Sequence, residues 1–266
     1  MNNLPLTLTI LGSGSSSGCP VIACDCDVCC SNNPKNVRTR CSAWFNIDNT
    51  HLIIDTGTDF RHQALREKIP QVNAVLYTHP HSDHVNGIDD LRAFCFRQKS
   101  PIDIYGNEFT IKNLQSRFDY AFLEPNHHWN RPVLIPHILD LEQSSTQINN
   151  IPIQYWQMPH GKWHVLSYRI GNIAWLTDVS EVSDEIIATY LQNLDYLFID
   201  CLMDKAYRNH LCVSQVLEIA PKINAKNTYL IHTTHHLGFD ETNIRLKQHN
   251  IRMAYDSMRI NAEITI

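Results

Sequence analysis

Apolar residues recur at every second position in two stretches of the chain, which is the pattern of a β-strand with one buried face. These are residues 4–10 and residues 260–266, close to the two ends of the sequence. Residues 42–47 and 51–54 read as the two strands of a hairpin. Short apolar runs predict further strands at residues 74–77, 102–105, 133–139, 151–158, 165–170, 173–176, 196–199 and 228–231.

Other segments predict helices. Residues 59–68 follow Thr58, a residue suited to capping a helix N-terminus, and residues 87–98 form a second helical segment. Three more lie at residues 183–193, 213–222 and 240–249. Strands dominate first and then alternate with helices, which predicts an α/β (α+β) sandwich. We therefore expect one domain spanning residues 1–266.

The least regular stretch is residues 118–131, which contain several aromatic residues and histidines. A loop that shapes a substrate site and an ordinary packed connection fit this stretch equally well. The role of the wider region, residues 107–146, stays open from sequence alone.

The composition is that of an ordinary globular protein. The 266 residues are 43% hydrophobic and 18% charged, with a net charge of −5, which argues against sequence-independent nucleic-acid binding. No apolar stretch reaches the roughly 18–20 residues that span a bilayer. Residues 1–5 lack the basic and apolar regions of a signal peptide. We expect a cytoplasmic protein without membrane association, in which the nine cysteines are ligands or buried thiols rather than disulfides.

The densest group of metal-binding side chains is the run from His79 to His84, with the pattern His-x-His-x-Asp-His. His79 and His81 are alternate residues, so an extended segment points both side chains the same way. Asp83 and His84 reach a second position if the chain turns into a helix there. This spacing can serve two adjacent metal ions, and it makes a metal-dependent hydrolase the leading hypothesis.

Further candidate ligands come just after apolar runs downstream. His160, Asp178 and His232 each follow a predicted strand. Loops at strand ends are where α/β folds place their chemistry. Because a pair of metal ions needs about seven or eight protein ligands, these residues are the natural complement to the His79 run.

The order of these ligands resembles that of the metallo-β-lactamase superfamily over nearly the whole chain. The resemblance implies a four-layer αββα sandwich with a dinuclear site along one edge. It also implies that His79, His81 and His160 bind one metal, that Asp83, His84 and His232 bind the other, and that Asp178 bridges them. Asp55 matches an early aspartate that lies beside the metals in that superfamily.

A second cluster, Cys24, Cys26 and Cys29, has the pattern Cys-x-Cys-x-x-Cys. Three thiolates with one distant ligand can complete a tetrahedral structural zinc site. His235 is the obvious fourth ligand, which would make residues 19–41 a zinc-binding loop. Cys30 and His236 compete for these roles, and three reduced thiols in a surface loop are the alternative.

The cysteine loop narrows the resemblance to the phosphoribosyl 1,2-cyclic phosphate phosphodiesterase family of the carbon–phosphorus lyase pathway. Three more segments resemble that family: residues 78–92, residues 175–178, and Asp200-Cys201 followed by Arg208-Asn209-His210. The resemblance implies a small-molecule phosphodiester substrate and suggests a homodimer, although the oligomeric state stays open.

The expected activity is hydrolysis of a cyclic phosphodiester by a hydroxide bound between two divalent ions, manganese or zinc. His210 is the expected general acid, because it matches the active-site histidine outside the metal set, and Asp83 and Asp55 complete the catalytic site. Arg208 and Lys162 are weaker candidates for holding a non-reacting phosphate.

Three alternatives stay open. The first is another hydrolase of the same fold, such as a tRNA 3′-processing nuclease, a thioesterase or a lactamase. The second is the related branch of pyrroloquinoline quinone biosynthesis, in which the histidine motif is eroded. The third is a non-catalytic metal-binding scaffold.

Overall fold

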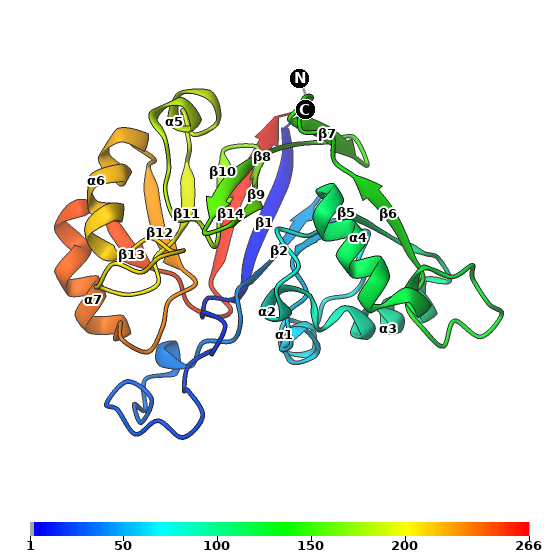
Figure 1. Cartoon of the computed structure of the whole chain (residues 1–266), viewed down its shortest axis with the longest axis horizontal. Helices are drawn as coiled ribbons and strands as arrows, with labels where there is room; N and C mark the ends of the chain where they lie inside the picture. The colour runs from blue at the N-terminus through cyan, green and yellow to red at the C-terminus, as the bar shows by residue number, and fades with distance from the viewer. Residues whose placement is uncertain (1–2, 266) are drawn as a thin grey trace.

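Two seven-stranded sheets pack against each other in the computed structural model, which describes residues 3–265 (Figure 1). The first sheet has the strand order β14-β1-β2-β3-β4-β5-β6, and the second has the order β13-β12-β11-β10-β9-β8-β7. The first sheet therefore joins distant parts of the sequence, because β14 returns to pair with β1, whereas the second sheet contains β7 to β13 in chain order.

The first sheet is antiparallel from β14 to β3 and parallel from β3 to β6. Its strands are β1 (Asn3–Gly12), β2 (Ser42–Ile47), β3 (Thr50–Ile54), β4 (Ala74–Leu76), β5 (Ile102–Gly106), β6 (Leu134–Ile138) and β14 (Arg259–Thr265). The helices in this half are α1 (Phe60–Glu67), α2 (Ser82–Val85), α3 (Leu91–Gln98) and α4 (Glu108–Arg117), with 3-10 turns η1 (Pro34–Asn36), η2 (Ile88–Asp90) and η3 (Asp119–Phe122).

The second sheet is antiparallel from β7 to β10 and parallel from β10 to β13. Its strands are β7 (Ser145–Ile148), β8 (Ile151–His160), β9 (Trp163–Ile170), β10 (Ile173–Leu176), β11 (Tyr196–Asp200), β12 (Asn227–Ile231) and β13 (Ile251–Met253). The helices here are α5 (Asp184–Tyr190), α6 (Val213–Ile223) and α7 (Phe239–Leu246), followed by the 3-10 turn η4 (Lys247–His249).

The main hydrophobic core lies between the sheets. Leu8 and Phe45 of the first sheet belong to the same buried cluster as Tyr155 and Trp175 of the second. Two further clusters join the outer face of each sheet to its helices, through residues such as Leu91 in one half. The layers therefore run helix, sheet, sheet, helix, which confirms the predicted αββα sandwich.

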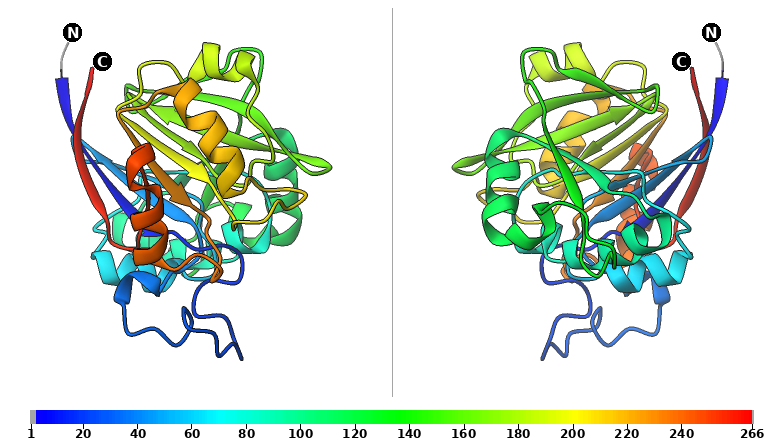
Figure 2. Two further views of the ribbon diagram at one scale, coloured as in Figure 1. Left: turned by 90° about the vertical axis from the view of Figure 1, so that its left-hand side faces the viewer. Right: turned by 90° about the vertical axis from the view of Figure 1, so that its right-hand side faces the viewer.

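The strands at the two ends of the described chain lie side by side. β1 pairs with β14 over seven residues, from Asn3 opposite Thr265 to Thr9 opposite Arg259 (Figure 2). Apolar residues alternate strictly in residues 4–10 and 260–266, and this pattern predicted both strands. Ile266 lies outside the described residues. Between residues 3 and 265, no helix has the length and apolar character needed to cross a bilayer.

Several local predictions need correction. Asp59, not Thr58, precedes α1, and the segment predicted as one helix at residues 87–98 divides into η2 and α3. The pattern also missed β7, β13 and α4. β13 is only three residues long, and α4 buries Thr110 among its apolar positions, so neither leaves a clear periodic signal.

Candidate metal centre

The His79 run forms the connection between β4 and α2. His79 follows the strand and is fully buried. His81 has an extended backbone immediately before α2, and Asp83 and His84 lie in that short helix. The chain therefore changes from extended to helical within six residues, which is how one run can serve two neighbouring positions.

The first group of convergent side chains is His79, His81, His160 and Asp178, whose nearest nitrogen and oxygen atoms all lie within 4.8 Å of one another. His79 Nε2 is 2.8 Å from His81 Nδ1. The Nε2 atoms of His79 and His160 are each 3.9 Å from Asp178 Oδ1. His160 is the last residue of β8, so the strand is two residues longer than the sequence indicated.

The second group is Asp83, His84 and His232. His84 Nε2 is 3.2 Å from Asp83 Oδ2, and His232 Nε2 is 3.5 Å from the same oxygen. Asp178 also approaches this group, at 3.1 Å from His84 Nε2 and 3.5 Å from His232 Nε2. Asp178 thus lies between the two groups, with one carboxylate oxygen toward His79 and the other toward His84.

The outer nitrogens of these imidazoles are held by neighbouring polar groups. His84 Nδ1 is 2.7 Å from Asp55 Oδ2, and His79 Nδ1 is 3.0 Å from Thr78 Oγ1. His160 Nδ1 is 2.9 Å from the carbonyl oxygen of Asn209. Contacts of this kind fix the ring orientation of histidines that bind metals, because they leave the other nitrogen free for the ion.

Burial lowers the pKa of His79, His81 and His160 below the ordinary histidine value, most strongly for His79. Removing an imidazolium from water is costly, so burial favours the neutral ring. A neutral imidazole is the form that binds a metal ion. These three side chains are therefore ready to act as ligands at neutral pH.

Asp178, the carboxylate shared by the two groups, is held in its ionised form. Burial opposes the charge on Asp178, but His232 and His84 outweigh it and lower the pKa of that carboxyl well below its usual range. Burial likewise disfavours a charged His84, but Asp178, Asp83 and Asp55 raise its pKa well above the ordinary value. Three carboxylates thus surround one imidazole, an excess of negative charge that favours binding of a cation.

Two buried imidazole nitrogens indicate that the histidines and carboxylates of this centre fit metal ions. His84 Nε2 and His232 Nε2 form no hydrogen bond among the described residues, although carboxylate oxygens lie 3.1 and 3.5 Å away. Buried polar atoms without a partner are costly, and ligand atoms of one ion face a common point instead of each other. Imidazole and carboxylate donors suit divalent transition metals, so the residues fit such ions.

His210 lies at the edge of the same centre. Its Nε2 is 3.9 Å from Asp178 Oδ1, and its Nδ1 is 3.1 Å from Asp200 Oδ2. Burial alone would lower the pKa of His210, but the charge and hydrogen bond of Asp200 raise it to about 9. His210 is therefore protonated at neutral pH, unlike His79, His81 and His160.

Asp200 is the residue of this centre to which the sequence assigned no role. It ends β11 and is fully buried, and its other oxygen lies 3.6 Å from His232 Nδ1. Its signal in the sequence is weak, because it is a single aspartate at the end of an apolar strand. The structure places it behind both His210 and His232.

The cysteine cluster closes around His235. The Sγ atoms of Cys24, Cys26 and Cys29 lie 3.3, 3.5 and 3.4 Å from His235 Nδ1. A tetrahedral zinc ion with Zn–S near 2.3 Å and Zn–N near 2.0 Å separates sulfur from nitrogen by about 3.5 Å. The four donors therefore fit one zinc ion. Cys30 is exposed and lies outside this group.

Neighbouring contacts fix the cysteine loop to the segment after β12. The backbone amides of Val21 and Cys29 donate to cysteine sulfurs, to Cys29 Sγ at 3.3 Å and to Cys26 Sγ at 3.5 Å. The buried Arg38 donates to the carbonyl oxygens of Thr234 and Leu237 at 3.0 and 2.9 Å. The loop is thereby attached to the stretch that carries both His232 and His235.

The centre opens into a pocket of about 370 Å³. Its walls include Ser15–Ser17 from the glycine-rich turn after β1, and Tyr207, Asn209 and His210 from the loop after β11. The glycine-rich turn therefore borders the metal centre. A volume of this order suits a small molecule.

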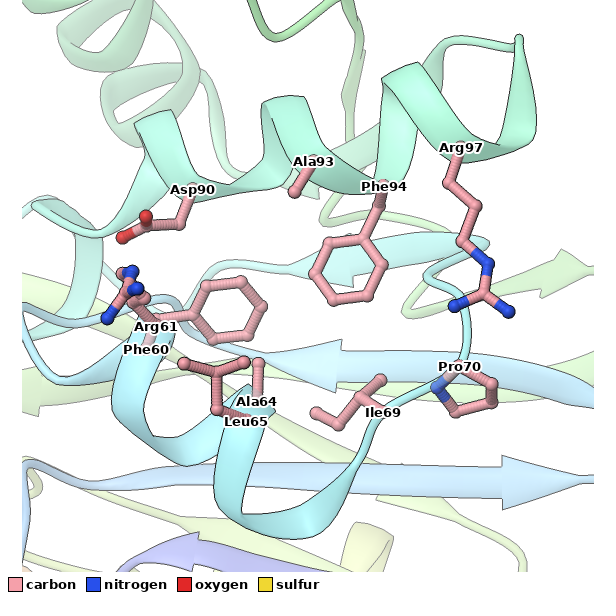
Figure 3. Close-up of a pocket in the computed structure, with 10 residues that line it drawn as sticks. All are labelled: Phe60, Arg61, Ala64, Leu65, Ile69, Pro70, Asp90, Ala93, Phe94 and Arg97. Carbon is pink, nitrogen blue, oxygen red and sulfur yellow. The ribbon is translucent and has the colours of Figure 1, made fainter.

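A separate pocket of about 340 Å³ lies between α1 and α3, away from these ligands (Figure 3). The rings of Phe60 and Phe94 and the side chain of Ile69 line its interior, and Arg61 and Arg97 stand at its two ends. Phe60 and Ile69 also belong to the buried cluster under the helices. This pocket is a gap in helix packing and contributes no residue to the metal centre.

Comparison with known proteins agrees with the fold and the metal centre described above. Residues 50–233 match the family model described as the β-lactamase superfamily domain. A crystal structure of a new diphosphatase from the PhnP family is 35% identical, with a TM-score of 0.92 and complete coverage of both chains. All seven candidate ligands of the two groups, from His79 to His232, lie inside the matched residues.

Two curated relatives are longer than this chain. An octanoyltransferase of Porphyromonas gingivalis is 31% identical over 252 residues, which cover 94% of this chain and 50% of that protein. A ribonuclease Z of Crocosphaera subtropica is 31% identical over 130 residues, 47% of this chain and 38% of that protein. The aligned part of this chain thus spans half or less of each curated relative. The family match, the fold and the ligand geometry agree, and the chain belongs to the metallo-β-lactamase superfamily and resembles the PhnP family.

Proposed function

We propose that this protein is a phosphodiesterase that hydrolyses a small cyclic phosphodiester, such as a phosphoribosyl 1,2-cyclic phosphate. The proposal rests on one observation: two ligand groups share Asp178, and a protonated His210 lies at their edge. The similarity to a PhnP-family diphosphatase supports chemistry at phosphorus.

The two groups would hold two divalent ions, zinc or manganese. His79, His81 and His160 form one ligand set, Asp83, His84 and His232 form the other, and Asp178 is shared. When bound, such a pair lowers the pKa of water and polarises a phosphoryl oxygen. Asp55 orients His84 through its hydrogen bond and does not reach the ions itself.

His210 is the proposed general acid. Hydrolysis of a cyclic diester breaks a bond between phosphorus and a sugar oxygen, and that oxygen must gain a proton as it leaves. His210 Nε2 faces the centre, while Nδ1 is held by Asp200. Asp200 therefore keeps the proton on the ring until the leaving oxygen takes it. His210 also groups with Asp178 and His232. The acid role is proposed because Asp200 holds Nδ1 and leaves Nε2 facing the centre.

The cysteine loop is proposed to hold a structural zinc ion through Cys24, Cys26, Cys29 and His235. The sulfur-to-nitrogen distances of 3.3–3.5 Å support this ligand set. A closed set of four protein ligands leaves no position for substrate, so this ion would stabilise structure only. It would fix the strand end from which His232 projects.

A tRNA 3′-processing nuclease is the second candidate, because the ribonuclease Z relative shares 31% identity over 130 residues. The net charge of −5 is unfavourable for a large RNA substrate. The name octanoyltransferase describes a protein about twice as long, of which this chain matches one half. We therefore do not carry acyl transfer over to this chain.

The test is a substrate panel with manganese or zinc added. It comprises bis(p-nitrophenyl) phosphate, nucleoside 2′,3′-cyclic phosphates, phosphoribosyl cyclic phosphate, a thioester and a tRNA precursor. Turnover of a cyclic diester with its loss in His210→Gln supports the proposal. Cleavage of the tRNA precursor alone would favour the nuclease, and turnover of the thioester alone would contradict phosphodiester chemistry.

A further inference from the structure

A second hollow of about 470 Å³ adjoins the metal centre. It shares His81, His160 and Asn209 with the pocket of the centre and is lined beyond them by Gly161, Lys162, Trp163 and Arg208. Among these described lining residues, only Trp163 has a large apolar side chain, and it is 40% exposed. An exposed indole ring beside candidate metal ligands offers a surface that a substrate can contact.

Strand pairing fixes Trp163 on the same side of the sheet as His160. The two residues are directly opposite each other at the end of the β8–β9 hairpin, and such a pair in an antiparallel sheet shares one face. In the turn between them, Gly161 has a positive φ of 62°, and a Cβ atom there would lie 2.5 Å from Asn209 Oδ1. The tip of the hairpin therefore rests against the loop after β11. The indole lies beside the metal centre, with its ring centroid 4.6 Å from that of His81.

Phe109 extends this aromatic surface from another part of the chain. It lies in the first turn of α4 and is 49% exposed, and its ring centroid is 5.5 Å from that of Trp163. Arg117, at the other end of α4, donates to the carbonyl oxygen of Pro80 and to Asn86 Oδ1, both at 2.6 Å. These hydrogen bonds fix α4 beside the connection between β4 and α2. The region of residues 107–146, whose role the sequence left open, therefore places a side chain beside the hollow.

The form of this surface favours a planar ring over an alkyl chain. Trp163 and Phe109 form an open layer and not an enclosed apolar cavity, since both rings are exposed. Polar side chains of Lys162, Arg208 and Asn209 line the same hollow. An alkyl chain on such a layer would keep most of its surface in water. A nucleobase gains stacking energy through one face, while its polar edge stays hydrated or forms hydrogen bonds with those side chains.

We propose that Trp163 and Phe109 form an aromatic platform on which the base of the substrate stacks. The substrate class is then a nucleoside cyclic phosphate, whose cyclic diester reaches the metal centre while its base lies on Trp163. This inference rests on the proposed phosphodiesterase function and adds to it the part of the substrate by which the protein selects it.

The test compares two substrates with the same reacting ring: adenosine 2′,3′-cyclic phosphate and 1-O-methylribose 2,3-cyclic phosphate, which has no base. The ratio of their kcat/KM values is measured in the wild type, in Trp163→Leu, in Phe109→Ala and in the conservative variant Trp163→Phe. Phe96→Ala is the control, because Phe96 is exposed on α3 and lines neither the pocket of the centre nor the hollow.

We expect the wild type and the control to favour the adenosine compound by about 10- to 100-fold. The ratio should fall toward one in Trp163→Leu, fall partly in Phe109→Ala and stay high in Trp163→Phe. A loss of folded protein or of bound metal affects both substrates alike, so it cancels in the ratio.

Equal kcat/KM for both substrates in the wild type overturns the platform, and so does a high ratio that Trp163→Leu leaves unchanged. If neither compound is hydrolysed, calorimetric binding of AMP and of ribose 5-phosphate to the metal-loaded proteins decides separately. Weaker AMP binding by Trp163→Leu than by Phe96→Ala, with equal binding of ribose 5-phosphate, then supports the platform while the phosphodiesterase proposal fails. Equal AMP binding by both variants, or an equal loss for both ligands, rejects the platform as well.

Discussion

Asp55 Oδ2 lies 2.7 Å from His84 Nδ1, and the same carboxylate accepts hydrogen bonds from the backbone amide and the hydroxyl of Thr78. Asp55 therefore connects the end of β3 to both ends of the His79 run. The carboxylate is fully buried and reaches the candidate metal positions only through these neighbours. It is a positioning residue for the second ligand group.

Asp55→Asn should weaken metal binding while the fold is retained. The amide can keep one contact with Thr78 but cannot give His84 a full negative charge, and losing such a partner costs about 10- to 100-fold in metal affinity. Metal content after dialysis against a weak chelator measures the effect, with far-UV circular dichroism as the control for folding. Unchanged metal content would show that His84 does not depend on Asp55.

His81→Ala and Asp178→Ala should each abolish phosphodiester turnover. Each substitution removes a proposed ligand, and Asp178 is shared by both groups, so its loss affects both ions. Neither side chain belongs to the hydrophobic clusters, and the unfolding temperature should change little. Turnover near the wild-type rate in both variants would exclude a dinuclear mechanism.

Asp200→Asn should move the alkaline limb of the pH–rate profile to lower pH. His210 can donate a proton only when its ring is protonated. Its contribution to kcat is therefore present below the pKa of His210 and is lost as the pH rises through that pKa. Asp200 raises that pKa to about 9, and without the charge, burial lowers it. The profile of kcat from pH 6 to 10 measures the shift.

His210→Gln is the matched control for this profile, because it should remove the same limb altogether. An alkaline limb at the same pH in Asp200→Asn as in the wild type would contradict the role of Asp200. Persistence of that limb in His210→Gln would assign it to another group.

Cys26→Ala should release one zinc ion per chain and lower the melting temperature. Three of the four donors remain, but an open ligand set binds zinc more weakly and fixes the loop less firmly. Cys30→Ala is the control, since Cys30 is exposed and outside the cluster. Equal zinc content and equal melting temperature in the two variants would refute the structural zinc.

Residues close together in sequence were the most predictable part of the site. The spacing from His79 to His84 already implied a turn from extended chain to helix, and the structure has that turn at α2. The sequence also predicted three more distant candidate ligands, His160, Asp178 and His232, because each follows an apolar strand and matches a family pattern. Strict alternation likewise revealed β1 and β14.

Relationships between distant segments could not be predicted. The contact of Gly161 with Asn209 depends on how the turn after β8 packs against the loop after β11, and no local pattern encodes it. The buried position of Asp200 behind two histidines likewise arises from the parallel pairing of β11 with β12. These are consequences of tertiary packing, which sequence periodicity does not report.

The spread of the ligands along the chain sets the time at which the protein can acquire its metals. The first candidates appear at residue 79, but Asp178 and His232 are synthesised much later. β14, which completes the first sheet, is later still. The first ligand set can therefore close only after Asp178 has left the ribosome, and the second only after His232, so metal binding is coupled to late steps of folding.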